Sequence, residues 1–179
     1  MILPFDEVDA LIASTRERGK REEKINTDEL IDEVLDLYVL DFVYGTNAAS
    51  EMLGTSIEPD MDEMKRSIEK KFDGIGFRER IREYGNKNDV EGIVRVIDTD
   101  STRIFNEGIL SAAQKAGATK KTWHTMEDDK VRDTHRPLAG MTIPLEAEFY
   151  TWDGDHAPAP GQFILPQNSI NCRCYLTIS

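Results

Sequence analysis

The chain has 179 residues, enough to bury a hydrophobic core, and fits one or two domains. It carries 34 acidic and 22 basic residues, for a net charge of −12, which argues against a protein that coats nucleic acid, so we expect weak or no binding of free DNA. No apolar run approaches the roughly 20 residues of a membrane-spanning helix, and the N-terminus lacks the pattern of a signal peptide. We therefore expect no membrane partner, and a cytosolic protein or a particle assembled in the cytosol.

The first part of the chain shows helical patterns. Residues 1–25 are charged and weakly patterned, and predict an N-terminal arm or helix. Thr27 is a predicted N-cap for an amphipathic helix that runs to about Leu53, where Gly54 ends it. Between Thr27 and Glu63 there are 11 acidic residues and no Lys or Arg. This acidic stretch is either a solvated helix face or a docking surface for a basic partner.

Further helices are expected before Gly117. One runs from Asp60 to about Phe72, and a short one from Phe77 to Tyr84. Asn88 is the predicted cap of the next segment. Asp98 or Asp100 is expected to cap a separate helix from about Ser101 to Ala116, with Gly117 as its C-terminal stop.

After Gly117 the helical periodicity disappears. Aromatic and β-branched residues lie between turn signals and predict short strands, marked by Trp123, Phe149, Tyr150, Trp152, Phe163, Ile164, Tyr175, Leu176 and Ile178. The predicted fold class is α+β: a helical N-terminal region followed by a small C-terminal domain with an antiparallel sheet. The expected division is an arm or helix at 1–25, a helical region at 26–117, and the α+β domain at 118–179.

The two cysteines, Cys172 and Cys174, are too close in sequence for an unstrained disulfide, and a cytosolic chain rarely keeps one. Metal ligation is one alternative. Zinc favours thiolate and imidazole ligands in a tetrahedron, so Cys172, Cys174 and His135 form the predicted metal set. A fourth ligand would come from Asp129, Asp133 or His156. The other interpretation is that no cofactor is bound, and that the cysteines pack as small apolar groups.

An acid–base cluster of Asp128, Asp129 and His135 is a competing interpretation of the same segment. No nucleophile elbow, zinc-protease motif or phosphate-binding loop accompanies it. The structural alternative is a turn in which Asp129 pairs with Arg132 and His135 caps the following loop. We therefore predict no catalytic residues.

Other conspicuous residues have structural interpretations. Trp123 and Trp152 are expected to anchor the core of the small domain. Asn171 is expected to hydrogen-bond the backbone in a bend. Arg173 lies between the cysteines and would face away from both in an extended strand, so we expect it to pair with an acidic residue of the helical part.

The order of these landmarks resembles the C-terminal domain of the phage Mu F-like minor head (head-morphogenesis) proteins. The matching residues are Lys121, Trp123, Asp129, Val131, Arg132, His135, Leu138, Gly140, Pro160, Gly161, Asn171, Cys172, Arg173 and Cys174. Upstream, Arg103, Phe105, Asn106 and Gly108 are similar to an R-x-F-N-x-G stretch of that family. The resemblance covers about residues 88–179.

The resemblance implies a structural protein of a phage or prophage head. Its implied partners are a portal protein oligomer and other capsid proteins, during procapsid assembly and DNA packaging or delivery. Its implied location is the virion, in the head interior or near the portal, and the host cytoplasm during assembly. The runner-up is a metal- or histidine-dependent, nuclease-like hydrolase that uses Asp129 and His135.

Overall fold

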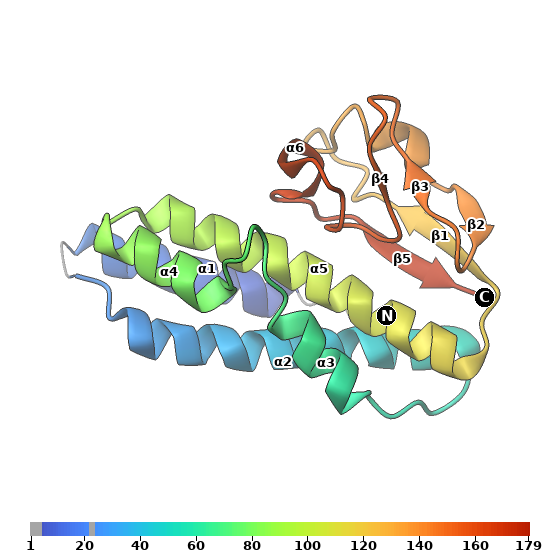
Figure 1. Ribbon diagram of the computed structural model, residues 1–179, viewed down its shortest axis with the longest axis horizontal. Helices are drawn as coiled ribbons and strands as arrows, with labels where there is room; N and C mark the ends of the chain where they lie inside the picture. The colour runs from blue at the N-terminus through green and yellow to red at the C-terminus, as the bar shows by residue number, and fades with distance from the viewer. Residues whose placement is uncertain (1–4, 22–23) are drawn as a thin grey trace.

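The computed structural model describes residues 5–21 and 24–179. Residues 1–4 and 22–23 of the predicted N-terminal arm or helix lie outside the described part. The long helices are α1 (Phe5–Lys20), α2 (Thr27–Leu53), α3 (Met61–Ile68), α4 (Phe77–Asn86) and α5 (Val90–Ala116). Figure 1 shows them as one elongated bundle, with α2 and α5 running along its length. No helix in the described ranges is both long enough and apolar enough to cross a membrane.

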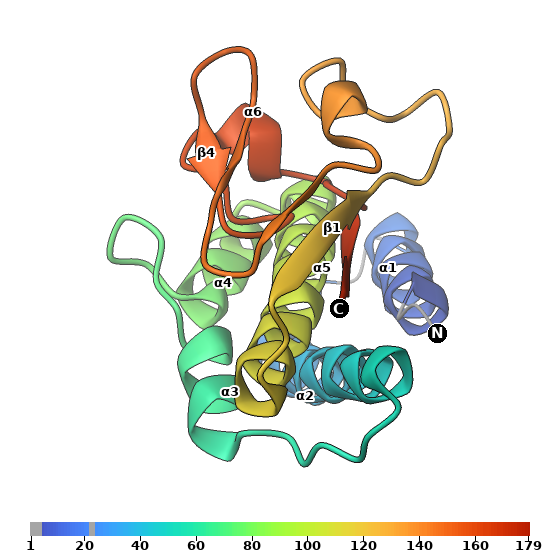
Figure 2. The ribbon, with the colours of Figure 1, turned by 90° about the vertical axis from the view of Figure 1, so that its right-hand side faces the viewer.

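The C-terminal residues form short strands above this bundle. These are β1 (Lys120–His124), β2 (Thr142–Pro144), β3 (Phe149–Tyr150), β4 (His156–Ala157) and β5 (Tyr175–Ile178), with a 3-10 turn η1 (Arg136–Leu138) and a short helix α6 (Pro166–Ser169). Strand β1 pairs antiparallel with both β2 and β5, while β3 and β4 form a separate hairpin. Figure 2 shows the strands and loops above the helices. The α+β prediction is confirmed.

Two helix predictions were wrong in detail. Asp98 and Asp100 do not start a new helix, because α5 is continuous from Val90 to Ala116. Asp100 is buried and faces Arg80, with 2.6 Å between a guanidinium nitrogen and a carboxylate oxygen. The carboxylate that resembled a helix cap therefore forms an ion pair with another helix. The predicted helix from Asp60 ends at Ile68 instead of Phe72.

The caps of the long helices are one residue away from their predicted positions. Asn26, not Thr27, caps α2, and its side chain accepts a hydrogen bond from the Glu29 N–H. Asp89, not Asn88, caps α5 through the Gly92 N–H. Gly54 and Gly117 end their helices in the left-handed conformation, as predicted.

The helices α2 and α5 cross with their backbones in contact. A Cβ atom on Gly45 would lie 2.1 Å from the Phe105 carbonyl oxygen, and one on Gly108 would lie 2.4 Å from the Phe42 carbonyl oxygen. One hydrophobic core fills the space between α1, α2, α3, α4 and α5. A second core joins the C-terminal halves of α2 and α5 to the strands, around Trp123. The site described below rests on this second core.

Asn106 on α5 attaches strand β5 to the helices. Its side-chain amide donates to the carbonyls of Thr102 (2.8 Å) and Cys174 (3.2 Å) and accepts from the Leu176 N–H (3.0 Å), all in the buried interior. A strand therefore docks on a helix through one polar side chain, which explains why an asparagine stands in the R-x-F-N-x-G stretch.

Replacing Asn106 by alanine is expected to lower the free energy of unfolding by roughly 2–3 kcal/mol, because two backbone groups of the C-terminal segment lose a buried partner. Denaturant titration measures this change. Gln114→Ala, at an exposed position on the same helix, is the control. Equal stabilities of the two variants would show that Asn106 does not hold β5.

Candidate metal centre

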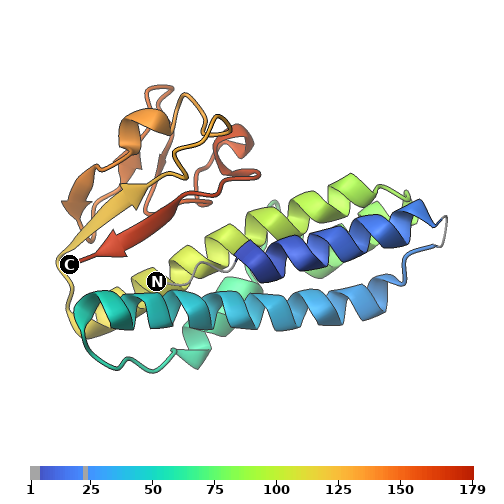
Figure 3. The same cartoon turned by 180° about the vertical axis from the view of Figure 1, so that it is seen from behind.

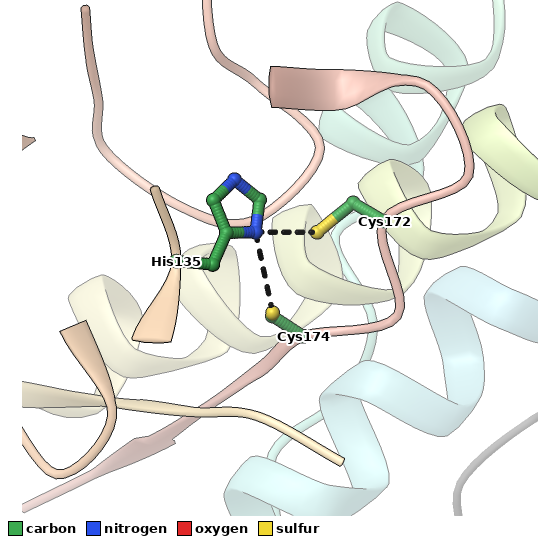
Figure 4. A group of neighbouring side chains, drawn as sticks. All are labelled: His135, Cys172 and Cys174. Carbon is green, nitrogen blue, oxygen red and sulfur yellow. Dashed lines mark hydrogen bonds between the residues drawn. The ribbon is translucent and has the colours of Figure 1, made fainter. Parts of the chain in front are cut away.

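His135, Cys172 and Cys174 lie close together next to the start of strand β5. His135 follows β1 through a loop, and the two cysteines lie in the segment that leads into β5 (Figure 4). The Nδ1 atom of His135 is 3.7 Å from the Sγ atom of Cys172 and 3.6 Å from that of Cys174. The three candidate ligand atoms lie within 4.8 Å of one another, and all three residues are buried. The structure thus brings together the three residues predicted as metal ligands.

Two aromatic rings and two hydrogen bonds hold the cluster in place. The rings of Trp123 and Phe163 lie 5.4 Å and 5.3 Å from the His135 ring, measured between centroids. Asn106 holds the Cys174 carbonyl. Before Cys172, Asn171 adopts a left-handed backbone (φ 53°), and its N–H donates to the Thr99 hydroxyl. Asparagine tolerates that conformation better than most residues, so its role here is backbone geometry. No side-chain hydrogen bond of Asn171 is found in the described chain.

The pKa values of the two thiols are shifted in opposite directions. A hydrogen bond from the Cys174 thiol lowers the pKa of Cys172 well below its ordinary value, and His135 lowers it further. The same hydrogen bond, together with burial, raises the pKa of Cys174. The pair therefore holds one thiolate readily, and a second thiolate needs a cation beside it. A divalent metal supplies such a cation.

The spacing of the three atoms suits zinc. Zinc at about 2.0–2.1 Å from nitrogen and about 2.3 Å from sulfur, at tetrahedral angles, places the nitrogen about 3.6 Å from each sulfur. The distances from His135 to Cys172 and Cys174 are 3.7 Å and 3.6 Å. Two cysteine thiolates and one imidazole are also donors that zinc prefers. The residues present therefore fit three of the four ligands of a zinc site.

The three residues proposed for the fourth ligand lie elsewhere. Asp129 is exposed, Asp133 pairs with Arg136 on the surface (3.4 Å), and His156 pairs with Glu148 in the β3–β4 hairpin (2.6 Å). The short distance in sequence between His135 and Asp129 or Asp133 did not predict a shared site, because the loop turns both carboxylates outward while His135 points into the core.

Neither the acid–base cluster nor the Asp129–Arg132 turn predicted for residues 128–135 matches the contacts. His135 is buried against the thiols, while Asp129 is exposed and Asp128 forms an ion pair with Arg173. The described contacts therefore do not assemble Asp128, Asp129 and His135 into an acid–base cluster. Arg132 donates to the Ile170 carbonyl, and no ion pair joins it to Asp129 in the described chain.

Two smaller predictions for this region were also wrong. His135 stands at the start of η1 but its side chain makes no cap hydrogen bond there. Arg173 pairs with Asp128 in the C-terminal part, and not with an acidic residue of the helices.

The glycine landmarks serve tight backbone geometry. Gly140 has φ 78°, and its N–H donates to the Trp123 carbonyl (2.8 Å). Gly161 follows the buried Pro160 with φ 77° and lies against the backbone of Arg103, where a Cβ atom would be 3.1 Å from the Arg103 Cα atom. The Pro-Gly loop therefore packs directly on α5, which links this landmark to the R-x-F-N-x-G stretch.

One tryptophan prediction is confirmed and the other is wrong. Trp123 is fully buried among Phe149, Phe163 and His135, whereas Trp152 is 72% exposed at the turn of the β3–β4 hairpin.

The sequence analysis did not single out Asp155, a buried carboxylate that accepts hydrogen bonds from the N–H groups of Ile164 and Leu165. Its place at the end of a turn was the available signal.

Comparison with known proteins is consistent with these landmarks. The model of the Phage Mu protein F like family matches residues 60–177, which extends the similarity upstream into α3 and α4. Minor head protein GP7 of Bacillus phage SPP1 is 30% identical over 81 residues, which cover 44% of this chain and 26% of that protein. The similarity thus spans about a quarter of that relative. No solved structure matches. Because the family match covers well over half of the chain, the protein belongs to the Phage Mu F-like family of phage head-morphogenesis proteins.

Proposed function

We propose that the protein acts without catalysis as a minor component of a phage or prophage head and associates with the portal oligomer and other capsid proteins. It would do so during procapsid assembly and DNA packaging or delivery, in the host cytoplasm and then inside the head or near the portal. The family match over residues 60–177 carries this proposal. The net charge of −12 supports weak binding of free DNA at physiological salt.

The acidic helix α2 offers the proposed contact with the portal. Several of its carboxylates are used within the fold: Asp28 pairs with Arg82 (3.1 Å), Glu33 pairs with Arg18 (2.8 Å), and Asp41 is buried. Burial raises the pKa of Asp41 well above its usual value, which favours its neutral form. Asp32 and Asp36 remain exposed and make no ion pair with any described residue. One helical turn apart, they place two uncompensated charges on the exposed face.

The double variant Asp32→Asn/Asp36→Asn is expected to bind the portal protein encoded by the same phage about three- to tenfold more weakly at low salt, because two exposed charges contribute modestly and are screened by salt. Co-sedimentation at low and high salt measures this. Asp73→Asn, which removes an exposed charge outside α2, is the control. Deletion of residues 1–63 is unsuitable, because it removes core residues such as Leu30 and Tyr38. If the double variant binds the portal protein as strongly as wild type at low salt, this face is excluded.

We also propose that His135, Cys172 and Cys174 hold a structural zinc ion. The fit of their separations to tetrahedral zinc supports this. Elemental analysis of protein purified without chelator is expected to find about one zinc per chain. Less than about a tenth of that amount would favour two apolar packed cysteines.

A further inference from the structure

The β3–β4 hairpin and the loop beside it carry three large apolar side chains into solvent. Tyr150, Trp152 and Ile164 are 64%, 72% and 70% exposed, and we call them the aromatic tip. The hairpin stands on the side of the strands remote from α2 (Figures 1 and 3). Tyr150 and Trp152 belong to one hairpin, and Ile164 is hydrogen-bonded to it through Asp155. Apolar side chains gathered in this way, unlike single exposed ones, mark a surface that another protein covers.

The aromatic tip is held rigidly. Asp155, which is buried, accepts hydrogen bonds from the N–H groups of Ile164 (3.1 Å) and Leu165 (3.0 Å) and from the Asn168 amide (3.0 Å). The Thr151 N–H donates to the Asp155 carbonyl and closes the turn around Trp152. A partner that binds this tip therefore spends little free energy on ordering it.

The surroundings of the aromatic tip are acidic. The sequence contains no Lys or Arg between Pro137 and Cys172. In the same interval Glu146, Glu148 and Asp153 are exposed. The complementary surface therefore combines an apolar pocket with basic side chains.

The chain itself carries such a surface. A pocket of about 520 Å³ lies between α1, α5 and the loops beside the candidate metal centre, and we call it the basic pocket. Its charged lining consists of the cations Arg16, Arg95, Lys130, Arg132 and Arg173 and the anions Asp9, Glu91 and Asp98. Its apolar lining consists of Ile12, Val94, Met126 and Val131, and Asn171 and two residues of the candidate metal centre, His135 and Cys174, complete it. The volume lies in the range of roughly 300–1,000 Å³ that accommodates groups larger than one indole ring.

Part of this positive charge is not neutralised within the fold. Arg16 is engaged by Glu91 (2.9 Å), and Arg173 by Asp128. Arg95 and Lys130 are exposed and form no ion pair with any described residue. No residue of the aromatic tip lines the pocket, so a chain does not fill its own pocket in the described structure.

We propose that two copies of this chain associate head to tail, with the aromatic tip of one copy inserted into the basic pocket of the next. Trp152 is the central anchor, and Arg95 and Lys130 face the acidic surroundings of the tip. The two contacting surfaces differ, so each copy retains one free tip or pocket, and growth continues until a ring closes or a chain ends.

Sedimentation velocity over a wide range of protein concentration tests the association. The wild-type mass is expected to rise above the monomer mass of 20.3 kDa as concentration increases. Trp152→Ala and the double variant Arg95→Ala/Lys130→Ala are each expected to associate at least about tenfold more weakly. Met61→Ala, at an exposed apolar position on α3 outside both surfaces, should behave as wild type. Emission from Trp152 should shift to the blue on association, while buried Trp123 gives a constant background.

An equimolar mixture of the two defective variants gives the sharpest result. The Trp152→Ala chain keeps its pocket and the Arg95→Ala/Lys130→Ala chain keeps its tip, so the mixture should form a dimer and nothing larger. A wild-type protein that stays monomeric throughout overturns the proposal. Self-association that survives in the pocket variant also overturns it, because that result indicates contact between two tips.

Discussion

Replacing Cys174 by serine is expected to reduce bound zinc from about one per chain to less than about a tenth, and to lower the free energy of unfolding by more than about 4 kcal/mol. If zinc is bound as proposed, the effect is large because the site forms only in the folded chain, and the free energy of zinc binding would then stabilise the fold. Cys174 lies one residue before β5, and the loss should therefore loosen this strand and its pairing with β1.

Elemental analysis and denaturant titration measure these two changes, and hydrogen exchange locates the loosened segment. A chelator added to wild-type protein should reproduce the effect, which separates loss of metal from the exchange of sulfur for oxygen. If the cysteines are only packed apolar groups, the chelator will leave the stability unchanged. Acid should also release the metal, because protons compete with zinc for the thiolates.

Replacing Gly45 by alanine is expected to destabilise the protein by more than about 3 kcal/mol, the upper end of ordinary overpacking. The added Cβ atom would lie 2.1 Å from the Phe105 carbonyl oxygen and 3.0 Å from the Ile109 nitrogen. Both atoms belong to the backbone of α5, so no side-chain rotation relieves the clash, and the two longest helices must separate.

Thermal unfolding with Asn47→Ala as control tests this expectation, since position 47 is exposed two residues further along α2. Helix propensity favours alanine over glycine by about 1 kcal/mol, so an isolated helix would gain from the substitution. A Gly45→Ala protein as stable as wild type would therefore show that α2 and α5 do not pack as closely as described.

Local signals in the sequence determined the elements and the chemistry of the candidate site. Gly54 and Gly117 end their helices because a left-handed residue is needed there and glycine adopts that conformation without strain. The loss of helical periodicity after Gly117 predicted the strands. The preference of zinc for thiolate and imidazole ligands singled out His135, Cys172 and Cys174, which the fold places within 4.8 Å.

The tertiary structure decided which partner each polar or aromatic group meets. Asp100 resembled a helix cap, but it lies within the continuous helix α5 and pairs with Arg80 of α4. Trp152 resembled a core anchor like Trp123, but the hairpin turn carries it into solvent. Glycine stops and ligand types depend on a few neighbouring residues, and the sequence alone determined them, whereas it placed the caps of α2 and α5 only to within one residue. Burial, ion pairing and the join between α5 and β5 through Asn106 depend on residues far apart in the chain, and only packing brings these together.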